Sequence, residues 1–216
     1  MKILKELPLL AIISLPIIYL GIIWNQLPEQ VPMHWNINGE IDRYGNKVEL
    51  FLIAILLPFV TYAIFLVAPK IDPKKKLGGM GNKLNKLKTI LTLFMSLIAI
   101  YLIHSVKIQS LTNPSYVIMS IGVLYILFGN YSKTLKPNYF IGIRTPWTLE
   151  NEKVWQATHK LSGLIWFIGG VIVVITSLIF EGRLNLIIFL IVTAVIALVP
   201  ILYSYFEYKK QQKLNS

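Results

Sequence analysis

Residues 129–163 read GNYSKTLKPNYFIGIRTPWTLENEKVWQATHKLSG, and long apolar segments flank this stretch on both sides. After residue 115 it is the only long segment whose polar and charged side chains the interior of a bilayer would not accept. Its single arginine, Arg144, together with its tryptophans and its histidine, must therefore lie where the membrane meets water. We expect most of the chemistry of the protein to reside here.

The composition places the chain among integral membrane proteins. Of its 216 residues, 55% are hydrophobic and only 14% are charged, and the mean hydropathy is +0.63, which does not fit a soluble domain. Lys and Arg outnumber Asp and Glu by 21 to 10, which fits loops that lie against an anionic leaflet better than direct binding of nucleic acid. The absence of cysteine excludes disulfides, thiolate metal sites and cysteine nucleophiles.

Six apolar segments have about the 20 residues that a helix needs to cross the hydrocarbon core. They predict an all-α polytopic membrane protein with spans at residues 7–24, 49–68, 89–106, 115–130, 161–180 and 184–206. No cleavage site follows the first span, so we interpret it as uncleaved; the fourth is the shortest. The expected domains are a two-helix unit over residues 1–68 with an outer loop at 27–47, a basic loop over 69–88, and a four-helix domain over 89–216 with a motif loop at 131–160.

The distribution of Lys and Arg predicts the orientation, because cationic loops near span ends remain cytoplasmic. The face that carries both termini, the basic loop and the motif loop holds 17 of these residues, whereas the opposite face holds four, namely Arg43, Lys47, Lys107 and Arg183. We therefore expect both termini on the cytoplasmic side of a bacterial plasma membrane. The lysines of the basic loop are expected to contact anionic lipids.

The outer loop has the pattern of a short β-hairpin. Val31, Met33 and Trp35 alternate along it, and Asn38-Gly39 is a strong signal for a tight turn. The simpler interpretation of the histidine and aspartate in this loop is hydrogen bonding that fixes its shape, and the alternative is contact with a ligand. The outer-loop residues that we expect to matter for function are Pro32, His34, Trp35, Gly39 and Asp42.

Within the motif loop the sequence predicts a turn, a bend and a helix start in succession. Residues 136–138 favour a turn, and Gly142 permits a backbone bend that delivers Arg144. A helix should start near Thr145 or Thr148 and run into the fifth span. The candidate functional residues of the motif loop and its flanks are Asn130, Asn138, Gly142, Arg144, Thr145, Trp147, Trp155 and His159.

Two interpretations of these residues stay open. Tryptophans at this depth are typical of an aromatic belt, and an interfacial arginine often binds lipid phosphate or the open carbonyls of a helix end. However, Trp155 and His159 are four residues apart and Glu152 is three before Trp155, so the three share one face of a helix. With Arg144 at a bend, this spacing favours a preorganised surface.

An enzyme is the least favoured class of function. His34, His104 and His159 fall on two faces in the expected topology, and no HExxH, GxSxG or metal-spaced acid pair occurs. Only Glu152 and His159 offer a base and its orienting partner for a membrane-embedded hydrolase. No acid lies inside an expected span, which argues against an ion-coupled transporter. We expect no catalytic residue, metal ligand or cofactor.

At the motif loop the chain resembles the SdpI family of bacterial membrane immunity proteins, whose C-terminal domain carries the pattern GN...KPNYFxGIRTPWTLxxExVWxxTHxxxG. The positions that carry this resemblance are Gly129, Lys136, Pro137, Asn138, Gly142, Arg144, Thr145, Pro146, Trp147, Thr148, Trp155, Thr158, His159 and Gly163. The outer loop is similar to the domain of unknown function that commonly precedes this one, at Leu27, Pro28, Val31, Pro32, His34, Trp35, Gly39 and Asp42.

The resemblance implies a protein that protects its cell from a secreted peptide toxin of the sporulation-delaying type. A member of the same family also transduces a signal by holding a small repressor at the membrane. The implied partners are therefore a secreted peptide toxin and a small cytoplasmic transcriptional repressor. The alternative function is a small-molecule or peptide transporter or exporter, and a membrane-embedded hydrolase is less favoured.

Reporter fusions test the expected orientation. Fusions at residues 40 and 182 should report an external location, and fusions at residues 78, 150 and 214 a cytoplasmic one, because 17 of the 21 cations lie on that face. Position 150 is the most informative, since it follows the short fourth span. An external signal there would contradict a cytoplasmic motif loop.

Overall fold

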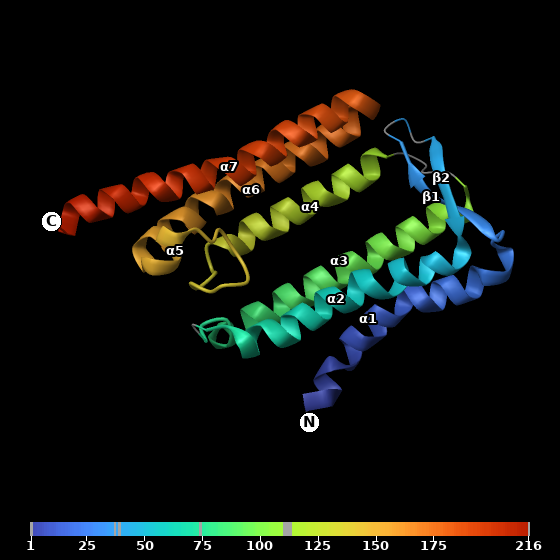
Figure 1. The fold of residues 1–216 in the computed structure, drawn as a ribbon, viewed down its shortest axis with the longest axis horizontal. Helices are drawn as coiled ribbons and strands as arrows, with labels where there is room; N and C mark the ends of the chain where they lie inside the picture. Colours follow the sequence, from blue (N-terminus) through green and yellow to red (C-terminus); the bar gives the residue numbers. More distant parts are fainter. Residues whose placement is uncertain (1, 37, 39, 74, 110–113, 216) are drawn as a thin grey trace. The chain divides into compact units, whose positions relative to one another are not determined.

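The computed structural model of the chain describes residues 2–36, 38, 40–73, 75–109 and 114–215 (Figure 1). Within them six helices are long and apolar enough to cross a membrane, which confirms the prediction of an all-α, multi-pass membrane protein. These helices are α1 (Lys2–Ile23), α2 (Leu50–Ile71), α3 (Asn82–Lys107), α4 (Ser115–Ser132), α6 (Glu152–Ile179) and α7 (Gly182–Asn215). The described chain also forms the short helix α5 (Pro146–Glu150), the strands β1 (Gln30–Trp35) and β2 (Ile41–Asn46), and the 3-10 turns η1 (Trp24–Gln26), η2 (Lys47–Glu49) and η3 (Gly78–Met80).

Several helices extend past the apolar segments that predicted them. α3 already starts at Asn82, α6 already starts at Glu152, and α7 continues to Asn215. Hydropathy marks only the part of a helix that lies in hydrocarbon, whereas backbone hydrogen bonding continues through polar turns that reach water. α4 is the shortest of the six, with 18 residues, and at 1.5 Å per residue it is about 27 Å long, close to the ~30 Å core.

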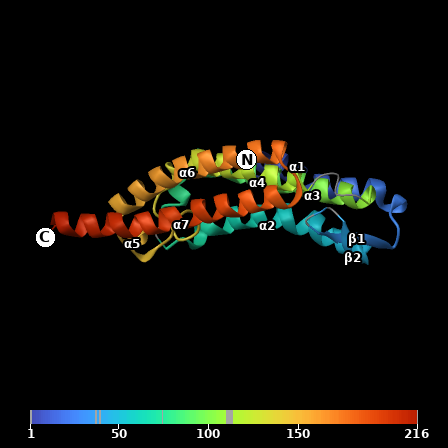
Figure 2. The same ribbon diagram turned by 90° about the horizontal axis from the view of Figure 1, so that it is seen from above.

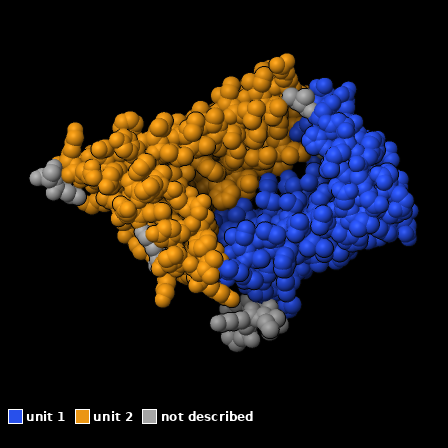
Figure 3. Space-filling view, in the orientation of Figure 1, with its two compact units in different colours: residues 1–67, 84–114 blue, residues 68–83, 115–216 orange. Residues whose placement is uncertain are grey.

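The chain folds into two compact units, which Figure 3 colours separately. Unit 1 comprises Met1–Val67 and Leu84–Pro114, and unit 2 comprises Ala68–Lys83 and Ser115–Ser216. Helix α3 therefore groups with α1 and α2, whereas the sequence assigned the third span to the C-terminal four-helix domain. Polar contacts and a shared apolar cluster join α3 to the other helices of unit 1.

One of these contacts is a buried ion pair in unit 1. The side chain of Lys88 on α3 is almost fully buried, and its ammonium lies 2.8 Å from the carboxylate of Glu6 on α1. The hydroxyl of Tyr62 on α2 donates to the same carboxylate over 3.1 Å. A lysine buried in a membrane helix needs such an acidic partner. Glu6 is the first residue of the candidate span of α1, directly before the start expected at residue 7.

A second contact joins the same helices toward their other ends. The hydroxyl of Tyr19 on α1 lies 2.7 Å from His104 Nδ1 on α3. Beside this second contact, toward the hairpin, α1, α2 and α3 share a cluster of buried apolar side chains, which includes Leu20, Ile23, Leu50, Ala54 and Ile103. The three helices of unit 1 are therefore joined by an ion pair near one end and by a hydrogen bond and an apolar cluster near the other.

The outer loop forms the predicted hairpin. β1 and β2 pair antiparallel, with Gln30 opposite Asn46 and Trp35 opposite Ile41, and the register shifts around His34. The side chain of Asn46 then caps the turn η2 that leads into α2. Short, hydrogen-bonded turns thus join the hairpin to the helices α1 and α2 of unit 1.

In unit 2, α4 and α6 pack closely through small residues that recur every seven positions. Ser115, Gly122 and Gly129 lie on α4, and Gly163, Gly170 and Ser177 lie on α6. A Cβ atom on Gly122 would lie 3.1 Å from the Gly170 carbonyl oxygen, and one on Gly163 would lie 2.9 Å from the Gly129 carbonyl oxygen. These pairs show that the two helices run antiparallel with their backbones in contact, as small residues permit in membrane bundles.

The third pair of this repeat is polar. The buried Asn185 at the start of α7 donates to Ser115 Oγ over 2.9 Å and accepts from Ser177 Oγ over 3.3 Å. Figures 1 and 2 show α7 running alongside α6. This hydrogen-bonded group therefore joins α4, α6 and α7 at one end of unit 2.

The substitution Gly129→Ala tests the contact between α4 and α6. Its Cβ atom would lie 2.5 Å from the Phe167 nitrogen and 2.8 Å from the Gly163 carbonyl oxygen, so the helices must separate. We expect the free energy of unfolding to fall by roughly 1–3 kcal/mol, measured by circular dichroism during denaturation in mixed micelles. The matched control is Gly21→Ala on α1, whose Cβ meets nothing within 4 Å. Equal stability of the two variants would contradict the close contact.

Candidate functional site

Asn138 organises the first half of the motif loop. Its side chain is fully buried, and its Oδ1 accepts hydrogen bonds from the backbone N–H groups of Phe140 and Ile141, each over 2.8 Å. Its Nδ2 donates to the carbonyl oxygens of Lys136 and Ile141, over 2.8 and 3.0 Å. Four hydrogen bonds from one amide hold a loop that has no regular secondary structure, which makes Asn138 the internal brace of residues 136–141.

The bend at Gly142 brings the loop onto the imidazole of His159. Gly142 has φ +111°, which side-chain-bearing residues rarely adopt. A Cβ atom there would also overlap His159 Nε2. The next residue, Ile143, donates its backbone N–H to that same Nε2 over 3.0 Å. The predicted role of Gly142 as a bend is confirmed, and its contact with His159 adds a second reason for glycine.

The hydrogen bonds of His159 assign its tautomer. Because Nε2 accepts from the Ile143 N–H, it carries no proton, so Nδ1 carries one and donates to the Trp155 carbonyl oxygen over 2.8 Å. The imidazole is neutral and buried, with both nitrogens engaged by backbone groups. This histidine supports the loop; neither of its nitrogens is free to take up a proton from a substrate.

Trp155 completes this buried group. Its ring stacks on the His159 ring, with centroids 4.0 Å apart and an interplanar angle of 20°. Its indole Nε1 donates to the Leu135 carbonyl oxygen over 2.8 Å, and the side chain is fully buried. Trp155 therefore fixes the start of the loop at Leu135, while His159 fixes its bend at Gly142. An aromatic-belt role, which requires exposure to headgroups, does not fit Trp155.

The second half of the loop ends in two helices where the sequence predicted one. Thr145 caps α5, accepting from the Thr148 N–H over 3.3 Å, and Thr148 Oγ1 accepts in return from the Thr145 N–H over 2.9 Å. α5 ends at Glu150, and the side chain of Asn151 then caps α6. The break at Asn151 turns the chain, so that only residues from Glu152 onward continue into the fifth span.

Trp147 on α5 docks against α7. Its indole Nε1 donates to Ser204 Oγ, and its ring lies edge-on to Tyr205 with centroids 5.5 Å apart. Ser204 is fully buried and also lies 3.4 Å from Thr145 Oγ1. These contacts join the motif loop to the last helix of unit 2. Nothing near Ser204 in the sequence marks it as a site residue, so the sequence interpretation missed it.

Arg144 differs from the buried residues around it. Its side chain is exposed, and its Nη1 donates to the Tyr139 carbonyl oxygen over 2.6 Å. This bond closes the turn between Tyr139 and Arg144 across the bend at Gly142. The other guanidinium nitrogens make no hydrogen bond to the part of the chain that the structure describes. The arginine is thus held at one nitrogen while the rest of its fork remains accessible.

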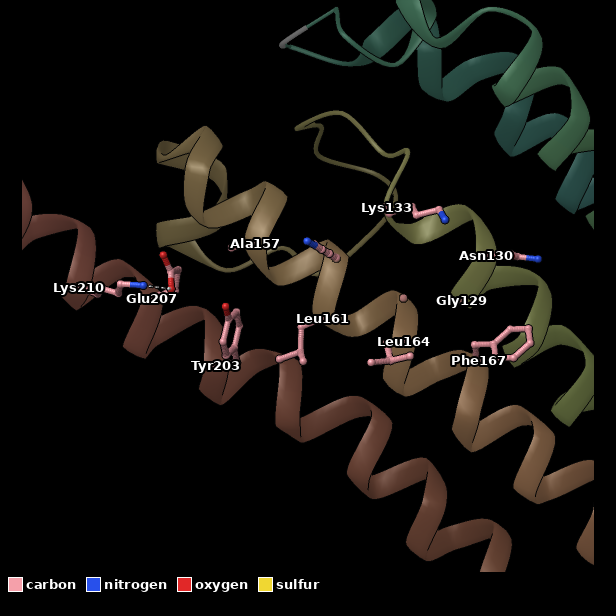
Figure 4. Close-up of a pocket in the computed structure, with 12 residues that line it drawn as sticks. Gly129, Asn130, Lys133, Ala157, Leu161, Leu164, Phe167, Tyr203, Glu207 and Lys210 are labelled. Atoms are coloured by element: carbon pink, nitrogen blue, oxygen red, sulfur yellow. Dashed lines mark ion pairs between the residues drawn. The ribbon is translucent and has the colours of Figure 1, made fainter.

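The structure separates two candidates from this group. Glu152 is exposed and pairs with Lys76 over 3.2 Å, so it does not share the buried surface of Trp155 and His159. This geometry gives no support to the least-favoured alternative, in which Glu152 and His159 act as a base and its orienting group. Asn130 lies on α4 with its side chain exposed and lines a cavity of about 850 Å³ between α4, α6 and α7 (Figure 4).

The outer-loop candidates lie in unit 1. His34 Nδ1 lies 2.6 Å from Asp42 Oδ1 across the hairpin, and both side chains are exposed, so the interpretation of hydrogen bonding within the loop is supported. Pro32 is buried in β1, and Trp35 packs against the apolar cluster of unit 1. Gly39 lies outside the described residues.

Comparison with known proteins follows the same two parts of the chain. Residues 134–204 match the SdpI/YfhL protein family, and residues 11–57 match a domain of unknown function, DUF1648. The chain is 25% identical over 206 residues to Immunity protein SdpI of Bacillus subtilis (strain 168), covering 95% of this chain and 97% of that protein. It is also 41% identical over 68 residues to an uncharacterized protein of Archaeoglobus fulgidus, covering 28% of this chain and 33% of that protein.

No solved structure matches the chain. The matched segment 134–204 contains Asn138, the bend at Gly142, the Trp155 and His159 stack, and the docking contact at Ser204. The six apolar helices and this match agree on the class of protein. The chain is a multi-pass cell membrane protein whose residues 134–204 match the SdpI/YfhL family.

Proposed function

We propose that this protein is an immunity protein that protects the cell producing it from a secreted peptide toxin. The observation that carries the proposal is the similarity to Immunity protein SdpI over 95% of this chain and 97% of that relative. Because the similarity covers both parts of the chain, it includes the outer hairpin and the motif loop. The similarity therefore supports a protective role for the whole chain and not for one of its domains alone.

The geometry of the motif loop supports a binding role in this function. Asn138, His159 and Trp155 are buried and make seven hydrogen bonds to backbone groups, whereas Arg144 is exposed in the loop that they shape. A rigid frame that presents one accessible guanidinium suits recognition of an acidic group on a partner. We propose that Arg144 makes this contact.

The geometry gives less support to a hydrolase. His159 has both nitrogens bonded to backbone groups, and Glu152 pairs with Lys76. A general base must reach the proton that it abstracts, and neither side chain is placed to act together with the other.

We also propose a second function, signalling to a small cytoplasmic repressor. The cation distribution favours a cytoplasmic location of the motif loop, where a cytoplasmic protein can reach it. A surface built around Arg144 on that side is suited to a cytoplasmic protein. On this proposal the outer hairpin faces the toxin and the motif loop faces the repressor.

A protection assay tests the main function. The full chain is expressed in a toxin-sensitive Bacillus strain that lacks its own immunity protein, and the cells are challenged with purified sporulation-delaying peptide. We expect survival to rise with the amount of the chain in the membrane. Unchanged killing at high membrane abundance would exclude immunity to this toxin class.

The substitution Arg144→Lys tests the role of the planar guanidinium in the same assay. Lysine keeps the positive charge but lacks the planar guanidinium, which can donate to the Tyr139 carbonyl oxygen and to a partner at the same time. We expect Arg144→Lys to lose protection as fully as Arg144→Ala, at wild-type abundance in the membrane. If charge alone near the headgroups mattered, at about 1 kcal/mol per cation, the lysine variant would protect like wild type, and that result would reject the proposed contact.

A control variant separates this effect from a general loss of charge. Lys153→Gln removes an exposed cation from the first turn of α6, close to the motif loop in sequence. We expect it to protect like wild type. A loss of protection equal to that of Arg144→Ala would show that net charge, rather than the position of the guanidinium, decides function.

A further inference from the structure

The lining of the cavity of about 850 Å³ in unit 2 changes from cationic to apolar along α6. It lies between α4, α6 and α7, with α6 between the other two helices (Figure 4). At one end its lining includes Lys160, and Leu161, Leu164 and Phe167 follow at helical spacing on the same side of α6. The cavity therefore has a cationic end and an apolar floor.

The cationic end carries charge that the protein does not neutralise. Lys133, Lys160 and Lys210 line the cavity from three different segments, and all three are exposed. The acid in the lining is Glu207, which lies 3.9 Å from Lys210 and also accepts from Gln211 over 2.8 Å. Neither Lys133 nor Lys160 forms an ion pair with any acid of the described chain. The positive charge at this end of the cavity therefore favours binding of an anion.

A second cavity, of about 810 Å³, adjoins the first at the same two lysines. Lys133 and Lys160 line both cavities. The second cavity has a strongly basic lining, which also includes Lys75, Lys76, Lys83 and Lys136. Its acid, Glu152, is already paired with Lys76 over 3.2 Å. Lys133 and Lys160 therefore lie where a basic cavity meets an apolar groove.

The depth of these residues along α6 matches the cross-section of a membrane leaflet. The apolar run of this helix begins at Leu161, directly after Lys160. At 1.5 Å per residue, Leu164 and Phe167 lie about 6 and 10 Å further along the helix axis than Lys160. An anion at the lysines would lie at headgroup level, and a chain on the leucine and phenylalanine side chains would lie in hydrocarbon.

We propose that this groove binds one anionic glycerophospholipid. Its phosphate lies against Lys133 and Lys160, with Lys210 at the rim, and one acyl chain lies along Leu164 and Phe167. Basic pockets between transmembrane helices are suited to such headgroups. A soluble acidic peptide would satisfy the lysines but would leave the apolar groove uncovered, so the lipid accounts for both halves. This site does not depend on the immunity function.

Binding of single lipids to the purified, delipidated full chain tests the proposal. Native mass spectrometry in non-ionic detergent would compare phosphatidylglycerol with phosphatidylcholine of the same chain length. We expect tight binding of one phosphatidylglycerol and weak binding of phosphatidylcholine. The variant with Lys133, Lys160 and Lys210 all changed to Gln should bind phosphatidylglycerol about 100-fold more weakly, from three headgroup contacts.

A matched variant controls for net charge. Lys70, Lys153 and Lys209 are exposed and line neither cavity, so changing all three to Gln removes the same charge elsewhere. We expect this control to bind phosphatidylglycerol like wild type. Equal losses in the two triple variants would reduce the effect to general electrostatics and would overturn the site.

A third variant tests the apolar half and does not alter charge. Leu164→Ser should weaken binding of long-chain phosphatidylglycerol while leaving binding of a dihexanoyl analogue unchanged, because the short chains do not reach this depth. Glycerol 3-phosphate should not displace the long-chain lipid at equal concentration. If it does, or if the triple Gln variant of the groove binds phosphatidylglycerol like wild type, the groove is not a lipid site and the lysines serve a soluble anion or acidic partner instead.

Discussion

The buried imidazole of His159 is the element on which the shape of the motif loop depends. It stacks on Trp155, donates to the Trp155 carbonyl oxygen and accepts from the Ile143 N–H at the bend. A bend without regular secondary structure has few backbone hydrogen-bond partners of its own. The His159 ring therefore supplies a partner that a helix or a sheet would otherwise provide. The absence of a side chain at Gly142 is what lets the ring come this close. The bend at Gly142 in turn sets the position of Arg144, two residues later.

The packing of the transmembrane helices also holds His159 in place. Ser132 at the end of α4 donates to the His159 carbonyl oxygen over 2.9 Å and lies 2.8 Å from Ser162 Oγ. That contact requires α4 and α6 to be close, which the paired glycines of the seven-residue repeat allow. A membrane gives little hydrophobic drive for helices to associate, so close backbone contact and interhelical hydrogen bonds carry the association. The geometry of the motif loop therefore depends on the close packing of α4 against α6.

Much of this could be predicted from the sequence, because the signals were local. Apolar runs located the six helices, alternation located the hairpin, and the glycine at position 142 and the threonine at 145 marked the bend and the cap. The contacts that depend on tertiary packing were not predictable. Ser204 lies far along the chain from Trp147, and the link of Lys88 to Glu6 joins the third helix to the first. Helical spacing put Glu152 and His159 on one side of the helix without saying which of them faces the interior, and the structure has Glu152 exposed and His159 buried.

The central claim, that a buried His159 holds the motif loop in one conformation, is tested most directly by hydrogen exchange of the loop amides. In wild type the N–H groups of Phe140, Ile141 and Ile143 should exchange slowly, since each donates to a buried side chain. In Gly142→Ala the Ile143 N–H should exchange rapidly, because the added Cβ displaces the imidazole that accepts it. Gly182→Ala, at φ +57° with nothing within 4 Å of its Cβ, carries backbone strain without that clash and should leave the loop protected. Rapid exchange of these three amides in the wild-type protein would contradict the account.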